Sequence, residues 1–176
     1  MITPDTKNWT WVLERRCPDC GFDAGSFNVA RTGEISRDLA RRWSHVLDRP
    51  DAAVRDRPEM WSPLEYGCHV RDVFRLFDRR LESMLSEGEP RFDNWDQDKT
   101  AVEDDYQSQE GSVVKAELVS AADVLADRFD AVTGDQWLRT GIRSDGALFT
   151  IRTFAQYLMH DPIHHLWDVG AELPAM

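Results

Sequence analysis

The sequence predicts an all-α protein, a four-helix bundle, for two reasons. Four segments carry apolar residues at helical spacing, and no segment shows a convincing strand pattern. The length of 176 residues suits one domain. We therefore expect a single domain over residues 1–176, with an extended N-terminal arm over residues 1–31 and a long loop between the second and third helices.

The first two predicted helices have clear limits. The first covers Thr32–Leu47, with its apolar residues on one face. The second begins after Ser62, the expected N-cap, because Pro63 suits the first helical position and Glu65 completes a capping box. Its apolar stripe extends to Gly88.

The third and fourth predicted helices follow a polar, acidic segment. Residues 87–111 show no helical pattern, and we expect them to run over the surface as a loop that covers a site. The third helix covers Ser112–Val132 and the fourth Thr150–Gly170. Because Pro162 removes a backbone hydrogen bond inside the fourth helix, we expect a kink or a break there.

The arm contains Cys17-Pro18-Asp19-Cys20-Gly21, which is similar to half of a zinc ribbon. A closed structural zinc site needs four ligands, and a second Cys-x-x-Cys does not occur in the sequence. We therefore interpret Cys17 and Cys20 as free thiols in a folded loop, with a redox pair as the alternative. Cys68, on the second helix, is interpreted as a core residue.

Charge and hydropathy exclude some classes of partner. The formal net charge of −11 disfavours binding to nucleic acid, and the arginines are interspersed with acidic residues. The longest apolar runs fall well short of the ~20 residues that cross a bilayer. The odd cysteine count and the lack of a signal-peptide core fit a reducing compartment, so we expect a cytoplasmic protein without a membrane partner.

Three histidines are the strongest functional signal. His160 and His164 lie four residues apart on the fourth helix and so project from one face, while His69 lies on the inner edge of the second helix. Three neutral imidazoles can bind a divalent ion and leave coordination positions open for chemistry. We predict a metal site with the ligands His69, His160 and His164. The alternative is a polar helix edge whose histidines bind backbone carbonyls.

Residues next to these histidines are given supporting roles. His165 points about 100° away from His164 on a regular helix, and we expect it in the core or behind the ligands. Asp161 and Asp168 either accept ring protons from ligand histidines or lie on the solvated surface. Trp95, in the acidic loop, is a candidate wall of a pocket.

Two motifs give the chain a resemblance to the DinB-like superfamily, particularly its actinobacterial members. Residues 61–73 (WSPLEYGCHVRDV) are similar to that family's second-helix motif, and residues 160–170 (HDPIHHLWDVG) to its last-helix motif. The resemblance covers most of the chain. It implies a DinB-like four-helix bundle with zinc or nickel bound by His69, His160 and His164 near one end.

The resemblance also implies a function. Characterised relatives include thiol-S-transferases and a maleylpyruvate isomerase that use low-molecular-weight thiols such as mycothiol. We therefore expect a metal-dependent transferase in which a mycothiol-like thiol attacks a small electrophile, with Arg143 as a candidate group for the polar parts of the thiol. The alternatives are a metal-dependent hydrolase that uses metal-bound water and a non-catalytic metal-binding stress-response module. The expected partners are the thiol, the electrophile and a second copy in a homodimer; catalytic side chains are not assigned.

Overall fold

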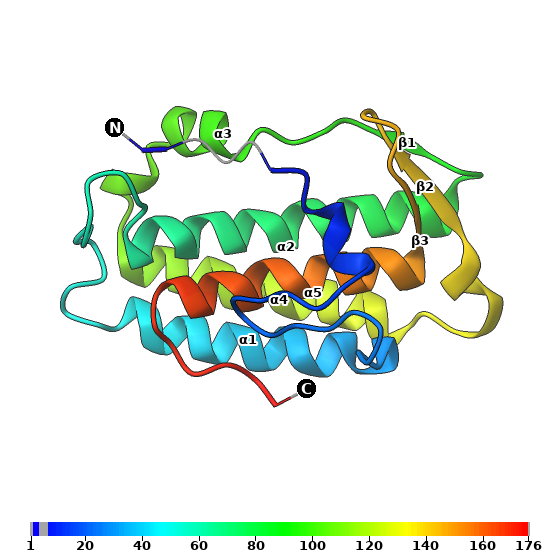
Figure 1. Cartoon of the computed structure of the whole chain (residues 1–176), viewed down its shortest axis with the longest axis horizontal. Coiled ribbons are helices and arrows are strands. Elements are labelled where there is room, and N and C mark those ends of the chain that lie inside the picture. Colours follow the sequence, from blue (N-terminus) through cyan, green and yellow to red (C-terminus); the bar gives the residue numbers. More distant parts are fainter. Residues whose placement is uncertain (1, 4–6, 176) are drawn as a thin grey trace.

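Four long helices run side by side in a computed structural model of the chain, which describes residues 2–3 and 7–175 (Figure 1). They are α1 (Thr32–Leu47), α2 (Pro63–Ser86), α4 (Gly111–Asp130) and α5 (Ile151–Asp168). Helix α4 packs against both α1 and α2, and α5 contacts the same two helices. The predicted four-helix bundle is confirmed. Residues 1 and 4–6 of the predicted arm, and Met176, lie outside the described residues.

The capping residues of α2 act as the sequence predicts. The Ser62 hydroxyl accepts a hydrogen bond from the Glu65 amide at 3.2 Å, and the Glu65 carboxylate accepts one from the Ser62 amide at 2.8 Å. Arg55 also pairs with Glu65, whose side chain is buried. This ion pair compensates the charge that the capping box brings into the interior.

Helix α5 continues without interruption through Pro162. The expectation of a break at this position is therefore wrong. The Pro162 carbonyl accepts a hydrogen bond from the buried Trp43 indole at 3.3 Å, which ties this part of α5 to α1. Because the helix is continuous, residues 160–165 keep regular helical spacing.

A small sheet corrects the expectation that the chain has no strands. It contains β1 (Arg91–Phe92), β2 (Thr140–Arg143) and β3 (Leu148–Thr150), with β2 in the centre, parallel to β1 and antiparallel to β3. The turn between β2 and β3 is closed by a hydrogen bond from the Gly146 amide to the Arg143 carbonyl at 2.8 Å. Strands of two to four residues are too short to show an alternating apolar pattern, which explains why the sequence did not reveal them.

The segment between α2 and α4 is more ordered than the predicted loop. It contains β1, the short helix α3 (Gln97–Glu103) and a 3-10 turn, Tyr106–Ser108. The Tyr106 hydroxyl donates a hydrogen bond to Asp72 on α2 at 2.6 Å, and Arg71 donates one to Gln109 at 2.7 Å. The sheet and these bonds hold both ends of the segment.

The N-terminal arm crosses α5 in front of the bundle (Figure 1). It forms two 3-10 turns, Trp9–Leu13 and Val29–Arg31, and the reverse turn at Cys17–Cys20 lies between them. The Gln156 side chain on α5 donates a hydrogen bond to the Ala24 carbonyl at 2.6 Å. The arm is thus packed on α5, the helix that carries His160 and His164.

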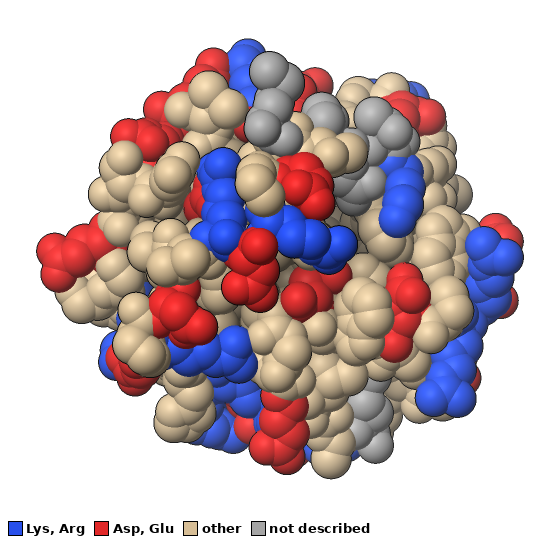
Figure 2. Space-filling view, turned by 60° about the vertical axis from the view of Figure 1, so that its left-hand side comes forward, with Lys and Arg blue, Asp and Glu red and all other residues tan. Residues whose placement is uncertain are grey.

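The surface does not separate the two signs of charge. On the face shown in Figure 2, Lys and Arg side chains lie among Asp and Glu side chains. Arg37 on α1, for example, pairs with Asp127 and Asp130 on α4. Within the described part of the chain, helices are too short or too polar to span a membrane.

Helices α1 and α4 approach each other closely at Gly33. A Cβ atom at this position would lie 2.9 Å from the Ala126 carbonyl oxygen and closer still to the Asp130 carboxylate. We expect Gly33→Ala to lower the free energy of unfolding by about 1–3 kcal/mol, because the clash with backbone outweighs the better helix propensity of alanine. Gly111→Ala is the control, since its Cβ would meet no atom nearer than 3.7 Å. Urea unfolding of both variants measures the difference; equal stability would contradict this account.

Candidate functional site

Helix α5 carries two pairs of potential metal ligands, offset from each other by one residue. His160 and His164 form the first pair, and Asp161 and His165 form the second, one residue further along. Within each pair the side chains lie one turn apart on the same face. Because the second pair is rotated by about 100° around the helix, the two pairs face different parts of the protein.

The pair Asp161 and His165 faces His69 on α2. Potential ligand atoms of these three residues all lie within 4.8 Å of one another. The Asp161 Oδ1 atom is 3.2 Å from His69 Nε2 and 3.9 Å from His165 Nε2. Two atoms that bind one ion at 2.0–2.2 Å with a tetrahedral angle lie about 3.3–3.6 Å apart. The set of two histidines and one carboxylate, called here the His69 group, therefore suits a divalent ion.

Asp168 orients one member of the His69 group. Its Oδ2 atom lies 2.8 Å from His165 Nδ1. A neutral His165 that donates its Nδ1 proton to Asp168 presents the lone pair of Nε2 on the side of Asp161. A carboxylate in this position fixes the tautomer of a histidine ligand and increases its basicity.

Trp95 covers the His69 group from the segment between α2 and α4. Its ring is stacked on the His69 ring, with 5.2 Å between the centroids and 3° between the planes. The Trp95 indole donates a hydrogen bond to the Thr100 hydroxyl at 2.7 Å, which holds the ring in place. The sequence prediction that this segment covers a site agrees with this position of Trp95.

The pair His160 and His164 faces the arm. Cys17, Cys20, His160 and His164 place potential ligand atoms within 4.8 Å of one another, and all four side chains are buried. The Cys17 Sγ atom lies 3.6 Å from His164 Nδ1. We call these four residues the Cys17 group.

Each group contains a buried ring nitrogen that the protein leaves without a partner. Among buried side-chain nitrogen and oxygen atoms of residues 2–3 and 7–175, only His69 Nδ1 and His160 Nε2 make no hydrogen bond. Buried polar atoms without a partner are rare in folded proteins and are often explained by an ion or a water molecule. In the His69 group, however, the unpartnered atom is Nδ1, whereas Nε2 is the ring nitrogen that lies near Asp161. The missing hydrogen bond therefore points to a ligand in the Cys17 group rather than in the His69 group.

The structure divides the ligand set that the sequence predicts. Among the described residues, donor groups within 4.8 Å do not combine His69 with His160 and His164. The three-histidine site stays a prediction. Sequence reasoning missed the assignment of His165 to the His69 group, and it missed that His160 and His164 supply the two donors that the Cys-x-x-Cys turn lacked.

Burial and neighbouring charges set the protonation of several donors. Burial, with a smaller effect of His164, lowers the pKa of His160 to about 4, so the ring is neutral at pH 7. Burial acts against ionisation of Asp161, but the neighbouring His69 outweighs it and lowers the pKa of Asp161 to about 2. Burial raises the pKa of the Cys20 thiol to about 12. Without a cation nearby this thiol stays protonated.

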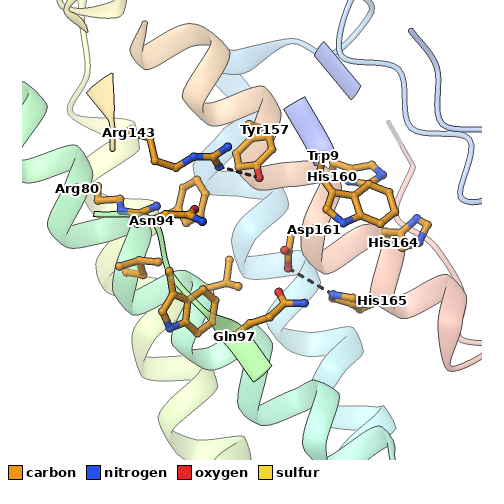
Figure 3. A pocket seen from close by; sticks show the side chains of 14 residues that line it. Trp9, Arg80, Asn94, Gln97, Arg143, Tyr157, His160, Asp161, His164 and His165 are labelled. Carbon is orange, nitrogen blue, oxygen red and sulfur yellow. Dashed lines mark hydrogen bonds and ion pairs between the residues drawn. The ribbon is translucent and has the colours of Figure 1, made fainter. Parts of the chain in front are cut away.

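A pocket lies beside the His69 group. Its lining includes Arg80 from α2, Arg143 from β2, and Tyr157, Asp161 and His165 from α5 (Figure 3). Trp9 from the arm and Trp95 from the segment between α2 and α4 complete this part of the lining. The pocket has a volume of about 90 Å³. A larger cleft of about 620 Å³ adjoins it and shares the lining residues Trp9, Asn94, Trp95, Arg143 and Tyr157.

Two arginines make the pocket wall cationic. Arg143 is bound to Asp145 by two hydrogen bonds of 2.9 and 2.7 Å and donates a third to the Tyr157 hydroxyl at 3.2 Å. Burial opposes the charge of Arg143, yet the bonds to Asp145 outweigh it and raise the pKa of Arg143. Arg80 is buried and donates to the Asp93 carbonyl. Burial, with the nearby charge of Arg143, lowers the pKa of Arg80 to about 10.

The fold is a four-helix bundle, and it carries two groups of side chains that could hold a metal ion. Residues 34–169 match the DinB superfamily. This match covers most of the chain, and the protein belongs to the DinB superfamily. The resemblance seen in the sequence is confirmed at the level of the superfamily.

A solved structure supports the fold. YfiT from Bacillus subtilis, described as a probable metal-dependent hydrolase with an unusual four-helix bundle topology, superposes with a TM-score of 0.66. The superposition covers 79% of this chain and 81% of YfiT, at 16% sequence identity. At this identity the likeness establishes the shared fold. A search of curated proteins finds no match.

Asp168→Asn tests the orientation of His165. We expect the affinity of the His69 group for a divalent ion to fall about 10- to 100-fold, because an asparagine can present its amide to His165 and stabilise the wrong tautomer. Titration of the apoprotein against a chelating indicator measures the affinity. Glu172→Gln, at an exposed position, is the control. Unchanged affinity in Asp168→Asn would show that Asp168 does not orient His165 for metal binding.

Proposed function

We propose that the protein is a metal-dependent enzyme that acts on a small anionic molecule. The observation that carries the proposal is the guanidinium group of Arg80, which is buried and lines the pocket beside the His69 group. Among the described residues, no carboxylate lies within ion-pair distance of Arg80. A buried charge without a counter-ion is costly, and an anionic ligand in the pocket relieves that cost.

The ligands of the proposed metal are His69, Asp161 and His165. Two histidines and one carboxylate leave coordination positions for a substrate, and two of these ligands, Asp161 and His165, line the pocket. A divalent ion bound there would lower the pKa of a coordinated thiol or water and so supply a nucleophile at neutral pH. Zinc and nickel are both compatible with imidazole and carboxylate donors.

The remaining side chains of the pocket bind and enclose the substrate. Arg80 and Arg143 attract its negative charge, and the Tyr157 hydroxyl, which accepts from Arg143, is placed to donate a hydrogen bond to it. Trp95 and Trp9 form apolar walls that limit access of water. A small molecule with a carboxylate and an electrophilic carbon fits this combination of groups.

A low-molecular-weight thiol is the nucleophile that we propose first. The three cysteines of the chain are buried, so the attacking thiol must come from a co-substrate. The polar cleft of about 620 Å³ that adjoins the pocket offers space for an extended, hydrophilic thiol such as mycothiol. In this reaction the thiolate sulfur forms a bond to the electrophilic carbon, the leaving group departs from that carbon with its bonding electron pair, and the thiol proton is released to solvent or to the leaving group.

Hydrolysis is the second candidate, and the small volume of the pocket, about 90 Å³, favours it. That volume accommodates a few water molecules beside Asp161 and His165. The description of YfiT as a probable metal-dependent hydrolase points in the same direction. Hydrolysis needs the same metal ligands and no thiol.

A kinetic assay distinguishes the two reactions. Metal-loaded protein is incubated with small carboxylate-bearing electrophiles and esters, with and without an added thiol, and products are quantified by mass spectrometry. Thiol transfer predicts turnover only with the thiol, and hydrolysis predicts turnover without it. Loss of turnover in His165→Ala supports the assigned ligands. Equal turnover by wild-type protein and His165→Ala would contradict the proposed function.

Arg80→Gln tests recognition of the anion. We expect KM for an anionic substrate to rise about 10- to 100-fold, because hydrogen bonds to charged groups contribute about 1.5–3 kcal/mol. The metal content should not change. The matched control is Arg79→Gln, which replaces the neighbouring, exposed arginine on α2 and should leave KM unchanged. A similar KM for wild type and Arg80→Gln would show that the substrate anion binds elsewhere.

A further inference from the structure

The Cys17 group joins two segments that are distant in the sequence. Cys17 and Cys20 lie on a reverse turn of the arm that is closed by a hydrogen bond from the Gly21 amide to the Cys17 carbonyl at 3.1 Å. Gly21 has a φ of +76°, a conformation that glycine adopts without strain. His160 and His164 approach this turn from α5. The result is two sulfur and two nitrogen donors in one buried cluster.

The distances in the cluster fit tetrahedral zinc. Zinc binds cysteine sulfur at about 2.3 Å and histidine nitrogen at about 2.0–2.1 Å, which places a sulfur and a nitrogen ligand about 3.5–3.6 Å apart. The observed distance between Cys17 Sγ and His164 Nδ1 is 3.6 Å. The second cysteine and the second histidine lie within the same 4.8 Å limit.

Protein contacts alone do not explain the cluster. A thiol–imidazole hydrogen bond accounts for Cys17 and His164, but it leaves His160 Nε2 buried and without a partner among the described residues. The cysteines are free thiols rather than a disulfide. His160 is 3% exposed, so water does not replace the missing partner easily.

We propose that Cys17, Cys20, His160 and His164 bind a structural zinc ion, separate from the metal of the proposed active site. Four protein ligands fill a tetrahedral shell and leave no position for a substrate, which is the pattern of structural zinc. Two thiolates also select zinc over hard cations such as magnesium or calcium. Binding displaces the two thiol protons, and the ion with two thiolates and two neutral imidazoles carries no net charge.

The zinc ion holds the arm against the bundle and thereby shapes the active-site pocket. The Trp9 ring lies 5.3 Å from the His160 ring and 5.0 Å from the His164 ring, and Trp9 lines both the pocket and the adjoining cleft. His164 also lies near Asp168, with 4.0 Å between Nε2 and Oδ1. Loss of the zinc would free the turn, and the wall that contains Trp9 would move with it.

Zinc content of the full-length protein tests the proposal. Protein is purified in reducing buffer without chelators, and zinc per chain is measured by mass spectrometry. Cys17→Ser and Cys20→Ser should each contain one zinc ion fewer than wild type. The matched control is Cys68→Ser, which alters a buried thiol on α2 outside the group and should keep its zinc. His69→Ala should also keep the thiol-bound ion. The result therefore does not depend on whether the His69 group binds a metal.

Thiol titration of the wild-type protein also tests whether the cysteines bind zinc, and it needs no substitution. An organic mercurial that caps thiols should release one zinc ion per chain to a metallochromic indicator, because only thiolate-bound zinc is displaced. Release should also increase tryptic cleavage at Arg15 and Arg16, exposed residues of the arm, by about tenfold as the arm opens locally. Equal zinc in wild type and the Cys17 and Cys20 variants, no zinc release by the mercurial, or a Cys17–Cys20 disulfide in freshly purified protein would overturn the proposal.

Discussion

The continuous register of α5 from His160 to His165 is the constraint on which the rest of the structure depends. Two donor pairs with a spacing of four residues, offset by one residue, point in directions about 100° apart. One pair meets His69 on α2, and the other meets the cysteine turn of the arm. Asp168 lies one turn further along, within 2.8 Å of His165 and 4.0 Å of His164, and so contacts both groups. A break in the helix at Pro162 would destroy both arrangements at once.

The segments outside the four helices complete the site that the bundle begins. The arm supplies Trp9 and the segment between α2 and α4 supplies Trp95, and these two rings face the pocket beside the His69 group. The sheet, absent from the expected architecture, places Arg143 in the pocket and binds the covering segment through the Ser144 side chain, which accepts a hydrogen bond from the Asn94 amide at 2.8 Å. The bundle thus provides the donors of the His69 group together with Arg80, and the connections provide the two tryptophan walls and Arg143.

The sequence predicts elements whose signal is local. The capping box at Ser62, the limits of α1 and the inward position of His69 follow from side-chain patterns within one helix, and the structure agrees with each. The division of the potential metal ligands into the His69 group and the Cys17 group depends on which segments meet in space. The Cys-x-x-Cys turn was visible in the sequence but lacked two ligands, and these lie more than a hundred residues away on α5. The strands of the sheet are too short to carry a pattern, so their pairing was not predictable.

The most direct test of two separate donor groups is anomalous diffraction at the zinc edge from crystals of the full-length protein loaded with zinc. This account predicts two peaks, one surrounded by Cys17, Cys20, His160 and His164 and the other by His69, Asp161 and His165. A single peak bound by His69, His160 and His164 would contradict it, and would confirm instead the three-histidine site that the sequence predicts.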